Sequence, residues 1–276
     1  MLIAQLTDTH IRPPGRLAYR KVDTAAYLER AVEHLGKLPL PVDAVIFTGD
    51  LVDFGTDAEY ERLAALIAPI KLPVYPIPGN HDDRDAMRRA FAHVSELPKS
   101  GDLSYAVECG QLRLVMLDST MAGKPHGDLD SARLRWLDET LCAAPGRPVL
   151  LALHHPPFLT GIRHMDVQNC FNSEGLEAVL TRHPQVLSVV CGHIHRTIFT
   201  SFAGRSASIA PSPAHAVDLD LDPLGAPAFR LEPPGLHLHW WQPEPGPFGR
   251  IVTHLAPIGD FEGPYPFFDA NGALID

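Results

Sequence analysis

The sequence predicts an α/β protein with a layered sheet core. Through residue 200, short apolar runs alternate with amphipathic segments of helical period, an order typical of sheets covered by helices. A chain of 276 residues that is 45% hydrophobic can bury a sizeable core. Beyond residue 200, Pro and Gly become frequent and the helical period is lost. We therefore expect a main domain over residues 1–215 and a C-terminal β-rich cap or tail over residues 216–276.

The first part of the chain predicts three strand–helix pairs. Residues 2–7 form an apolar run, and residues 23–36 place apolar side chains on one helical face. Residues 44–48 and 57–67 repeat this order, as do residues 74–77 and 84–93. Pro78 and Gly79 end the third strand and leave Asn80, His81 and Asp82 on one tight turn. Taken alone, this turn is typical of a surface loop.

The second part predicts a hairpin and two further strand–helix repeats. Two strands, 103–107 and 112–117, flank the turn "ECGQ". Helices are expected at 131–142 and 173–183, and strands at 149–153 and 186–190. Farther on, "LHLHWW" and "RIVTHLAPI" predict two strands separated by "QPEPGPFG".

Charge and cysteine content exclude several classes of protein. A net charge of −10 and the absence of a Lys/Arg run argue against a nucleic-acid polymer as partner. An anionic substrate stays possible because bound metal cations can reverse the local field. The four cysteines form no CxxC pair, which predicts a reducing, cytoplasmic location. The start "MLIAQLTDTH" lacks a basic region, and we expect neither a signal peptide nor a membrane span.

Polar residues of one chemical kind follow five separate apolar runs. A spacing of two, as in the first and last pairs, points both side chains of a strand to the same side. Ligands gather beyond the carboxyl ends of strands in α/β sheets, so the five positions predict one shared site. Its members are Asp8 and His10, Asp50, Asn80 and His81, His154 and His155, and His193 and His195.

These residue types predict a metal centre with two ions. Oxygen and imidazole ligands suit Zn, Mn, Fe, Co or Ni, and the lack of thiolates argues against a structural Cys-type zinc site. About seven ligands with one shared carboxylate fit two ions roughly 3.5–4 Å apart. Asp50 is the natural bridge because a carboxylate has charge and lone pairs for two cations.

The same residues carry a family resemblance. Asp8-x-His10, Gly49-Asp50-x-x-Asp53, Gly79-Asn80-His81-Asp82, His154 and Gly192-His193-x-His195 resemble the signature of the calcineurin-like metallophosphoesterases. The stretches "DTHIR", "YPIPGNHDD", "LDSTMAG", "LHHPPF", "HMD", "CGHIH" and "SIAPSPAH" resemble one branch, the bacterial class III cyclic-nucleotide phosphodiesterases and metal-dependent glycerophosphodiesterases. The resemblance covers residues 1–216 and implies a four-layer αββα sandwich.

The resemblance implies a role for each site residue. One metal would be held by Asp8, His10, Asp50 and His195, and the second by Asp50, Asn80, His154 and His193. The ions would be Fe, Mn, Zn or Co. His81 would lie beside the phosphate and His215 near the substrate. Tyr19 would line the pocket or pack as a surface tyrosine, and His155 would support a ligand or belong to the core.

The implied reaction is hydrolysis of small phosphodiesters, either glycerophosphodiesters or 3′,5′-cyclic nucleotides, by metal-activated hydroxide. The region of Asn80 would stabilise developing charge, and His81 or His215 would donate a proton to the leaving oxygen or orient the phosphate. Phe54 stands where the protein-phosphatase branch has a phosphate-binding arginine, which disfavours a phosphoprotein phosphatase.

Two alternatives remain at this point. One is a phosphomonoesterase, nuclease or nucleotide hydrolase of the same superfamily. The other is a binding module that kept the fold and lost the site, which is disfavoured because every expected ligand position is filled. The aromatic stretches "HWW" and "PYPFF" could supply a homo-oligomer interface.

Overall fold

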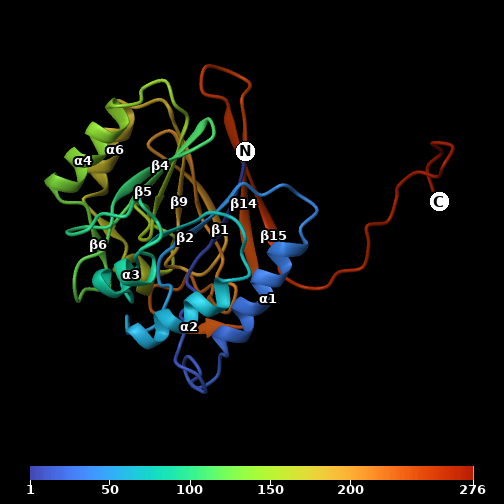
Figure 1. Ribbon diagram of the computed structural model, residues 1–276, viewed down its shortest axis with the longest axis horizontal. Coiled ribbons are helices and arrows are strands. Elements are labelled where there is room, and N and C mark those ends of the chain that lie inside the picture. Colours follow the sequence, from blue (N-terminus) through green and yellow to red (C-terminus); the bar gives the residue numbers. More distant parts are fainter. Residues whose placement is uncertain (276) are drawn as a thin grey trace.

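The computed structural model describes residues 1–275 and shows two β-sheets packed between two groups of helices (Figure 1). The first sheet has the order β15-β14-β1-β2-β3, and the second has the order β10-β11-β9-β7-β5-β4. One apolar cluster joins helices α1, α2 and α3 to the first sheet and continues to the inner face of the second. Another joins helices α4 and α6 to the outer face of the second sheet. The four-layer αββα prediction is therefore confirmed.

In the first sheet, three parallel strands are joined by helical connections, as the sequence predicts. The strands are β1 (Leu2–Leu6), β2 (Ala44–Thr48) and β3 (Val74–Ile77). The helices are α1 (Thr24–Lys37), α2 (Asp57–Ile67) and α3 (Arg84–Ala90). Each helix begins at a residue whose side chain accepts a backbone N–H, namely Asp23, Thr56 and Asp83. Such caps contribute about 1 kcal/mol each and fix where a helix starts.

The second sheet has a parallel centre and antiparallel edges. Its strands are β4 (Tyr105–Cys109), β5 (Leu112–Leu117), β7 (Val149–Leu153), β9 (Val186–Cys191), β10 (Ile198–Phe202) and β11 (Arg205–Ile209). Helices α4 (Ser131–Cys142) and α6 (Ser173–Thr181) cover it and lie side by side in Figure 1. The hairpin β4–β5 follows the prediction, whereas β10 and β11 were not expected. Neither strand has an apolar run that would have predicted it. Strand β10 is largely exposed, so its residues need not be apolar.

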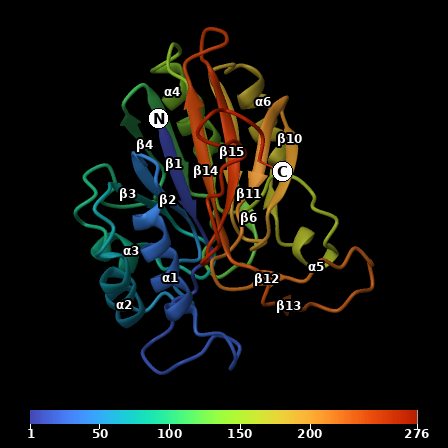
Figure 2. The same ribbon diagram turned by 90° about the vertical axis from the view of Figure 1, so that its right-hand side faces the viewer.

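Two short strand pairs and one helical turn lie outside the two sheets. Strand β6 (Gly127–Asp128) pairs with β8 (Cys170–Phe171), and β12 (Ala216–Val217) pairs with β13 (Phe229–Arg230). A single helical turn, α5 (Arg163–Asp166), precedes β8. Figure 2 shows α5, β12 and β13 gathered at one end of the sandwich. Among residues 1–275, no helix is both long and apolar enough to cross a membrane.

The C-terminal residues are β-rich, but their strands are part of the first sheet and not a separate cap. Strand β14 (Gly235–Gln242) pairs antiparallel with β1, and β15 (Arg250–Pro257) pairs with β14. Leu236 and Leu238 are buried in the main core. The expected boundary at residue 216 therefore does not separate the sheet from its last strands. Beyond them, residues 259–275 run away from the body (Figure 1) with several exposed aromatic side chains.

Candidate metal centre and active site

The predicted site residues meet where strands of both sheets end. Asp8 and His10 follow β1, Asp50 follows β2, and Asn80 and His81 follow β3. From the second sheet, His154 follows β7, and His193 and His195 follow β9. Every one of these residues is buried except Asn80 and His81, which are half-buried.

The backbone at this junction is strained. Five site residues that are not glycine have positive φ angles: Asp8, His10, Asp50, His193 and His195. Such conformations cost about 1–3 kcal/mol each and persist where the surroundings enforce them, often at functional sites. Strand β1 ends at Leu6, so strand alternation is not what brings Asp8 and His10 together. The left-handed turn does this instead.

Glycines next to the site permit its close packing. A Cβ on Gly79 would lie 2.2 Å from Oδ1 of Asp50, and one on Gly192 would lie 2.1 Å from Oγ1 of Thr7. Neither distance is compatible with a side chain. The glycines of the motifs "GNHD" and "GHIH" are therefore required for the metal-site carboxylates to approach their neighbouring backbone.

A first group of ligand atoms comes from Asp8, His10, Asp50 and His195, all within 4.8 Å of one another. Nε2 of His10 lies 3.2 Å from Nε2 of His195, and that same His195 nitrogen lies 3.3 Å from Oδ1 of Asp8. Two imidazole nitrogens and two carboxylates directed at one point are the donor set that a cation requires. The residues of this group therefore fit a metal ion.

A second group lies on the other side of Asp50. Oδ2 of Asp50 is 3.4 Å from Nε2 of His154 and 3.7 Å from Nε2 of His10. Three buried atoms here have no hydrogen-bond partner within residues 1–275: Oδ1 of Asn80 and Nε2 of His154 and His193. Unpaired buried polar atoms are costly, so this set also fits a cation. Asp50 stands between the groups, the position expected of a bridge.

Neighbouring groups orient the ligand rings. Nδ1 of His10 contacts Oδ1 of Asp53 at 3.2 Å, and Arg12 holds the other oxygen of Asp53 at 2.7 Å. Nδ1 of His154 lies 2.7 Å from the backbone oxygen of Thr48. Such contacts fix the tautomer and aim Nε2 at the ion. The sequence contained Asp53 in its motif but gave no signal of this supporting role.

The charges of the protein itself shift the pKa values of the ligands. Burial raises the pKa of Asp8 to about 6, with Asp50 adding to the increase. Burial would also raise the pKa of Asp50, but His154, His81 and His10 lower it well below its usual value. Burial lowers and Asp50 raises the pKa of His154, which reaches about 9. The pKa values of the two carboxylates are therefore shifted in opposite directions, that of Asp8 upward and that of Asp50 downward.

The residues expected near the substrate line a cavity of about 460 Å³ above these ligands. His81 is held by a 2.8 Å contact between Nδ1 and the backbone oxygen of Asp53. Tyr19 packs edge-on against His215, with ring centroids 5.3 Å apart, and His215 in turn packs against His195. His81, His215 and Tyr19 therefore share one cavity with Asp50 and Asn80.

The lining of the cavity also includes residues to which the sequence analysis gave no role. They are His164 and Met165 of the "HMD" stretch, Gln168, and Phe229 on β13. Phe229 lies 5.0 Å from Tyr19 between ring centroids. No motif marks Phe229, because the motifs end before residue 217. Phe229 reaches the cavity because β13 pairs with β12.

Asp82 has a structural role, whereas His155 lies against His154 and His193 with its buried Nε2 unpartnered within residues 1–275. Oδ2 of Asp82 accepts the N–H groups of Gly79 and Leu51, and Tyr60 donates to its Oδ1 at 2.7 Å. Asp82 thus ties the turn after β3 to the loop after β2, which explains the last letter of "GNHD". His155 lies beside His154 with its Nδ1 2.9 Å from Oγ of Ser119.

Comparison with known proteins decides the family. The model of the calcineurin-like phosphoesterase family matches residues 1–197. This chain is a calcineurin-like phosphoesterase. It is 41% identical to a probable glycerophosphodiester phosphodiesterase GpdQ from Arcobacter nitrofigilis, over 100% of both chains. It is 33% identical to the 3′,5′-cyclic adenosine monophosphate phosphodiesterase CpdA of Escherichia coli, over 86% of this chain and 85% of that one.

Solved structures agree on the fold. A dimetal phosphatase from Danio rerio superposes with a TM-score of 0.65 at 16% identity, covering 94% of the phosphoesterase and 97% of that chain. The predicted family resemblance and the prediction of a hydrolase are therefore confirmed.

Proposed function

We propose that this phosphoesterase hydrolyses small phosphodiesters, either glycerophosphodiesters or 3′,5′-cyclic nucleotides, with two transition-metal ions. One observation carries the proposal: Asp50 lies between two ligand groups, each with unpaired or facing donor atoms. The names of the relatives support diesters as substrates, because one acts on glycerophosphodiesters and another on cyclic adenosine monophosphate.

The first ion would be held by Asp8, His10, Asp50 and His195, and the second by Asp50, Asn80, His154 and His193. Oxygen and imidazole donors favour Fe, Mn, Zn or Co over calcium or magnesium. When bound, a pair of such ions neutralises phosphate charge and lowers the pKa of water, which provides the nucleophile. The amide of Asn80 is a neutral ligand, so it offsets less of that positive charge than a carboxylate would.

The residues around the cavity would position the diester and its leaving group. The contact of Nδ1 with Asp53 fixes the ring of His81 and leaves Nε2 for substrate. His215 faces the same cavity from the other wall. Either imidazole is placed to bind the phosphate or to pass a proton to the leaving oxygen. Tyr19 would contact the alcohol portion, since this residue is 54% exposed and lies beside His215.

The aromatic wall favours cyclic nucleotides as one candidate substrate. Tyr19 and Phe229 present two rings at the mouth of the cavity, and aromatic rings stack well on nucleobases, by about 1–3 kcal/mol per base. The similarity to the Arcobacter protein favours glycerophosphodiesters instead. Both substrates therefore belong in the test.

A substrate panel with defined metals tests the proposal. Purified protein is stripped of metal, reloaded with Mn, Zn or Co, and assayed with cyclic AMP, a glycerophosphodiester, and the p-nitrophenyl diester and monoester. We expect metal-dependent turnover with a preference for diesters. A clear preference for the monoester would instead support a phosphomonoesterase, and binding without turnover would support a binding module.

We also propose a cytoplasmic location, a small-molecule partner and self-association. The four cysteines are free within the described chain, as suits a reducing compartment. The exposed aromatic residues of the C-terminal arm, Phe261, Tyr265, Phe267 and Phe268, could pack against a second copy. Sedimentation analysis would measure this association.

A further inference from the structure

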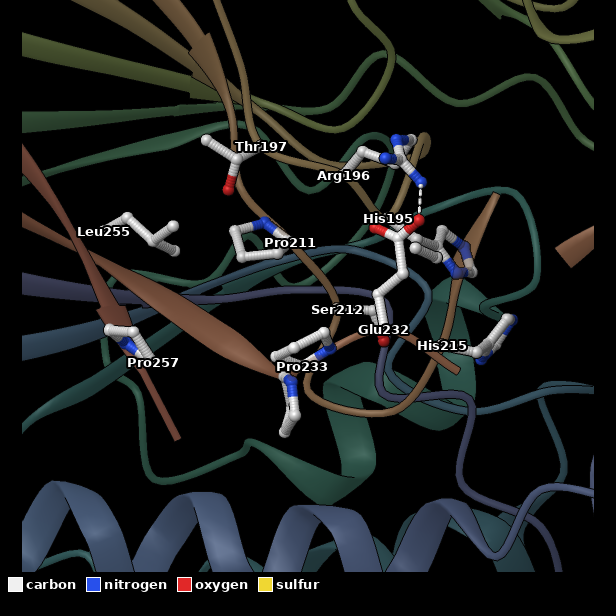
Figure 3. A pocket seen from close by; sticks show the side chains of 12 residues that line it. His195, Arg196, Thr197, Pro211, Ser212, His215, Glu232, Pro233, Leu255 and Pro257 are labelled. Carbon is white, nitrogen blue, oxygen red and sulfur yellow. Dashed lines mark hydrogen bonds and ion pairs between the residues drawn. The ribbon is translucent and has the colours of Figure 1, made fainter. Parts of the chain in front are cut away.

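A second cavity lies behind two histidines of the site. His195 and His215 line both this cavity and the substrate cavity, and so form the wall between them. Its volume is about 280 Å³. Figure 3 shows Leu255, Pro211, Pro257 and Thr197 on one side of it, and Arg196, His195, Glu232 and His215 on the other. The polar residues include Arg196, Thr197, Ser212 and Glu232.

His195 differs from other proposed ligands in lacking a protein partner for its second nitrogen. Its Nε2 faces Asp8 and His10. Its Nδ1 is buried and has no hydrogen-bond partner within residues 1–275. His10 and His154, by contrast, direct Nδ1 at Asp53 and at the backbone of Thr48. Because a histidine that binds metal through Nε2 carries a proton on Nδ1, His195 needs an acceptor.

Glu232 is the one carboxylate on this cavity. Arg196 donates to its Oε1 at 2.9 Å, which leaves Oε2 for a second donor. Figure 3 shows its carboxylate on the same side of the cavity as the His195 ring. No direct hydrogen bond joins these two side chains in the described part of the chain. Water can fill the interval, since a buried water needs only roughly 10–15 Å³ of accessible space and two to four polar partners.

We propose that ordered water in this cavity joins Nδ1–H of His195 to the Glu232 carboxylate, and that Glu232 is a positioning residue for the first metal ion. This inference rests on the proposed function, because it takes His195 as a ligand. An acceptor at Nδ1 holds the ring in the ligating tautomer and makes Nε2 more basic. Loss of such a partner typically lowers metal affinity or activity by about 10–100-fold.

Paired substitutions separate this role from the ion pair with Arg196. Glu232→Ala removes the acceptor and the charge, whereas Glu232→Gln removes only the charge and keeps an acceptor oxygen. We expect calorimetric titration to show one ion bound about 10–100-fold more weakly in Glu232→Ala. The second ion should be unaffected, and Glu232→Gln should stay close to wild type. Glu108→Ala is the control, because Glu108 also pairs with arginines but lies on the β4–β5 hairpin.

Each result decides the matter. Wild-type affinity in Glu232→Ala, or equal losses in the Ala and Gln variants, would overturn the inference. A wild-type protein that binds no metal would instead refute the proposed function. A high-resolution crystal structure of the zinc-loaded wild type gives an independent measurement if Glu232→Ala does not fold. Water within hydrogen-bond distance of His195 Nδ1 is expected, and a dry cavity would contradict it.

Discussion

The two sheets supply chemically different halves of the site. The proposed ligands after the first sheet are two carboxylates, an amide and one imidazole, from Asp8, Asp50, Asn80 and His10, whereas those after the second are imidazoles alone, from His154, His193 and His195. Neither sheet holds a complete ligand group. The first group needs His195 and the second needs His154 and His193. Metal binding should therefore depend on sheet packing and also strengthen it.

Removal of metal should produce the largest effect. Exhaustive chelation should abolish diesterase activity, because the nucleophile would no longer form near neutral pH. It should also lower thermal stability, since a ligand at 100 times its Kd stabilises the folded state by about 2.7 kcal/mol. Activity assays and thermal melts before and after reloading measure both effects. Full activity in protein shown by elemental analysis to be metal-free would refute the two-metal proposal.

Substitution of ligands should separate the shared residue from the unshared ones. Asp50→Ala should weaken both ions because Asp50 lies between the groups, whereas Asp8→Ala should weaken mainly one. Elemental analysis and calorimetric titration measure the occupancy of each site. Two ions bound normally in Asp50→Ala would show that the bridge is assigned wrongly.

Within the first-sheet half, Asn80 and His81 should act differently although they are neighbours. The His81→Ala variant should still bind both metal ions, and its turnover should fall by about 10²–10⁴-fold if the imidazole is a general acid. The loss should be larger for an alkoxide leaving group than for p-nitrophenolate, which scarcely needs a proton. Equal losses would show that His81 only positions phosphate, and a lost metal ion would make it a ligand.

The second sheet does end in one carboxylate, but an arginine neutralises it. Asp118 follows β5, is fully buried, and receives a 2.6 Å hydrogen bond from Arg84 on α3. Burial raises its pKa, but Arg84, together with hydrogen bonds from the backbone of Leu103 and the side chain of Thr120, holds the pKa below the usual value. Asp118→Asn should lower the free energy of unfolding by about 3–5 kcal/mol at neutral pH.

The pH dependence of that loss follows from the direction of the shift. Because the folded pKa is depressed, the stabilisation is complete above the unfolded pKa of about 3.9. It is lost as pH falls through the lower folded value. Urea unfolding of wild type and Asp118→Asn should therefore converge at strongly acidic pH. Asp85→Asn, which removes an exposed pair with Arg88, is the control and should change little at any pH.

The smallest effect should come from the C-terminal arm. Deletion from residue 259 onward removes a stretch after β15 whose residues 259–275 are exposed, so folding and metal content should be unchanged and only self-association should fall. Deletion from residue 235 onward should instead unfold the protein, because it exposes β1 and the core around Leu236 and Leu238. Sedimentation and circular dichroism distinguish the two. If deletion of the arm unfolds the protein as deletion from residue 235 does, the arm contributes to the stability of the fold.

Local sequence patterns predicted the residue types of the site and most of the layers. Period-2 and period-3.6 patterns are local, so they predicted β1, β2, β3, β5, β7 and β9 with their helices to within a few residues. Asp, Asn and His at the ends of buried strands, directly after glycine in the case of Asp50, Asn80 and His193, predicted one shared site, because few other reasons place those residue types after so many buried strands. The motif "GNHD" predicted a ligand at Asn80 and a phosphate contact at His81, whereas the structural role of Asp82 follows from its contacts alone.

The pairing of distant segments with the two sheets could not be predicted from local patterns. Strand β14 has no local feature that selects β1 as its partner, since antiparallel register depends on long-range packing. The same return of the chain brings Phe229 to the substrate cavity and Glu232 to the cavity behind His195. The left-handed backbone that joins Asp8 to His10 is likewise enforced by packing. Local patterns carry residue types and periods, whereas register and convergence arise from contacts between residues far apart in the chain.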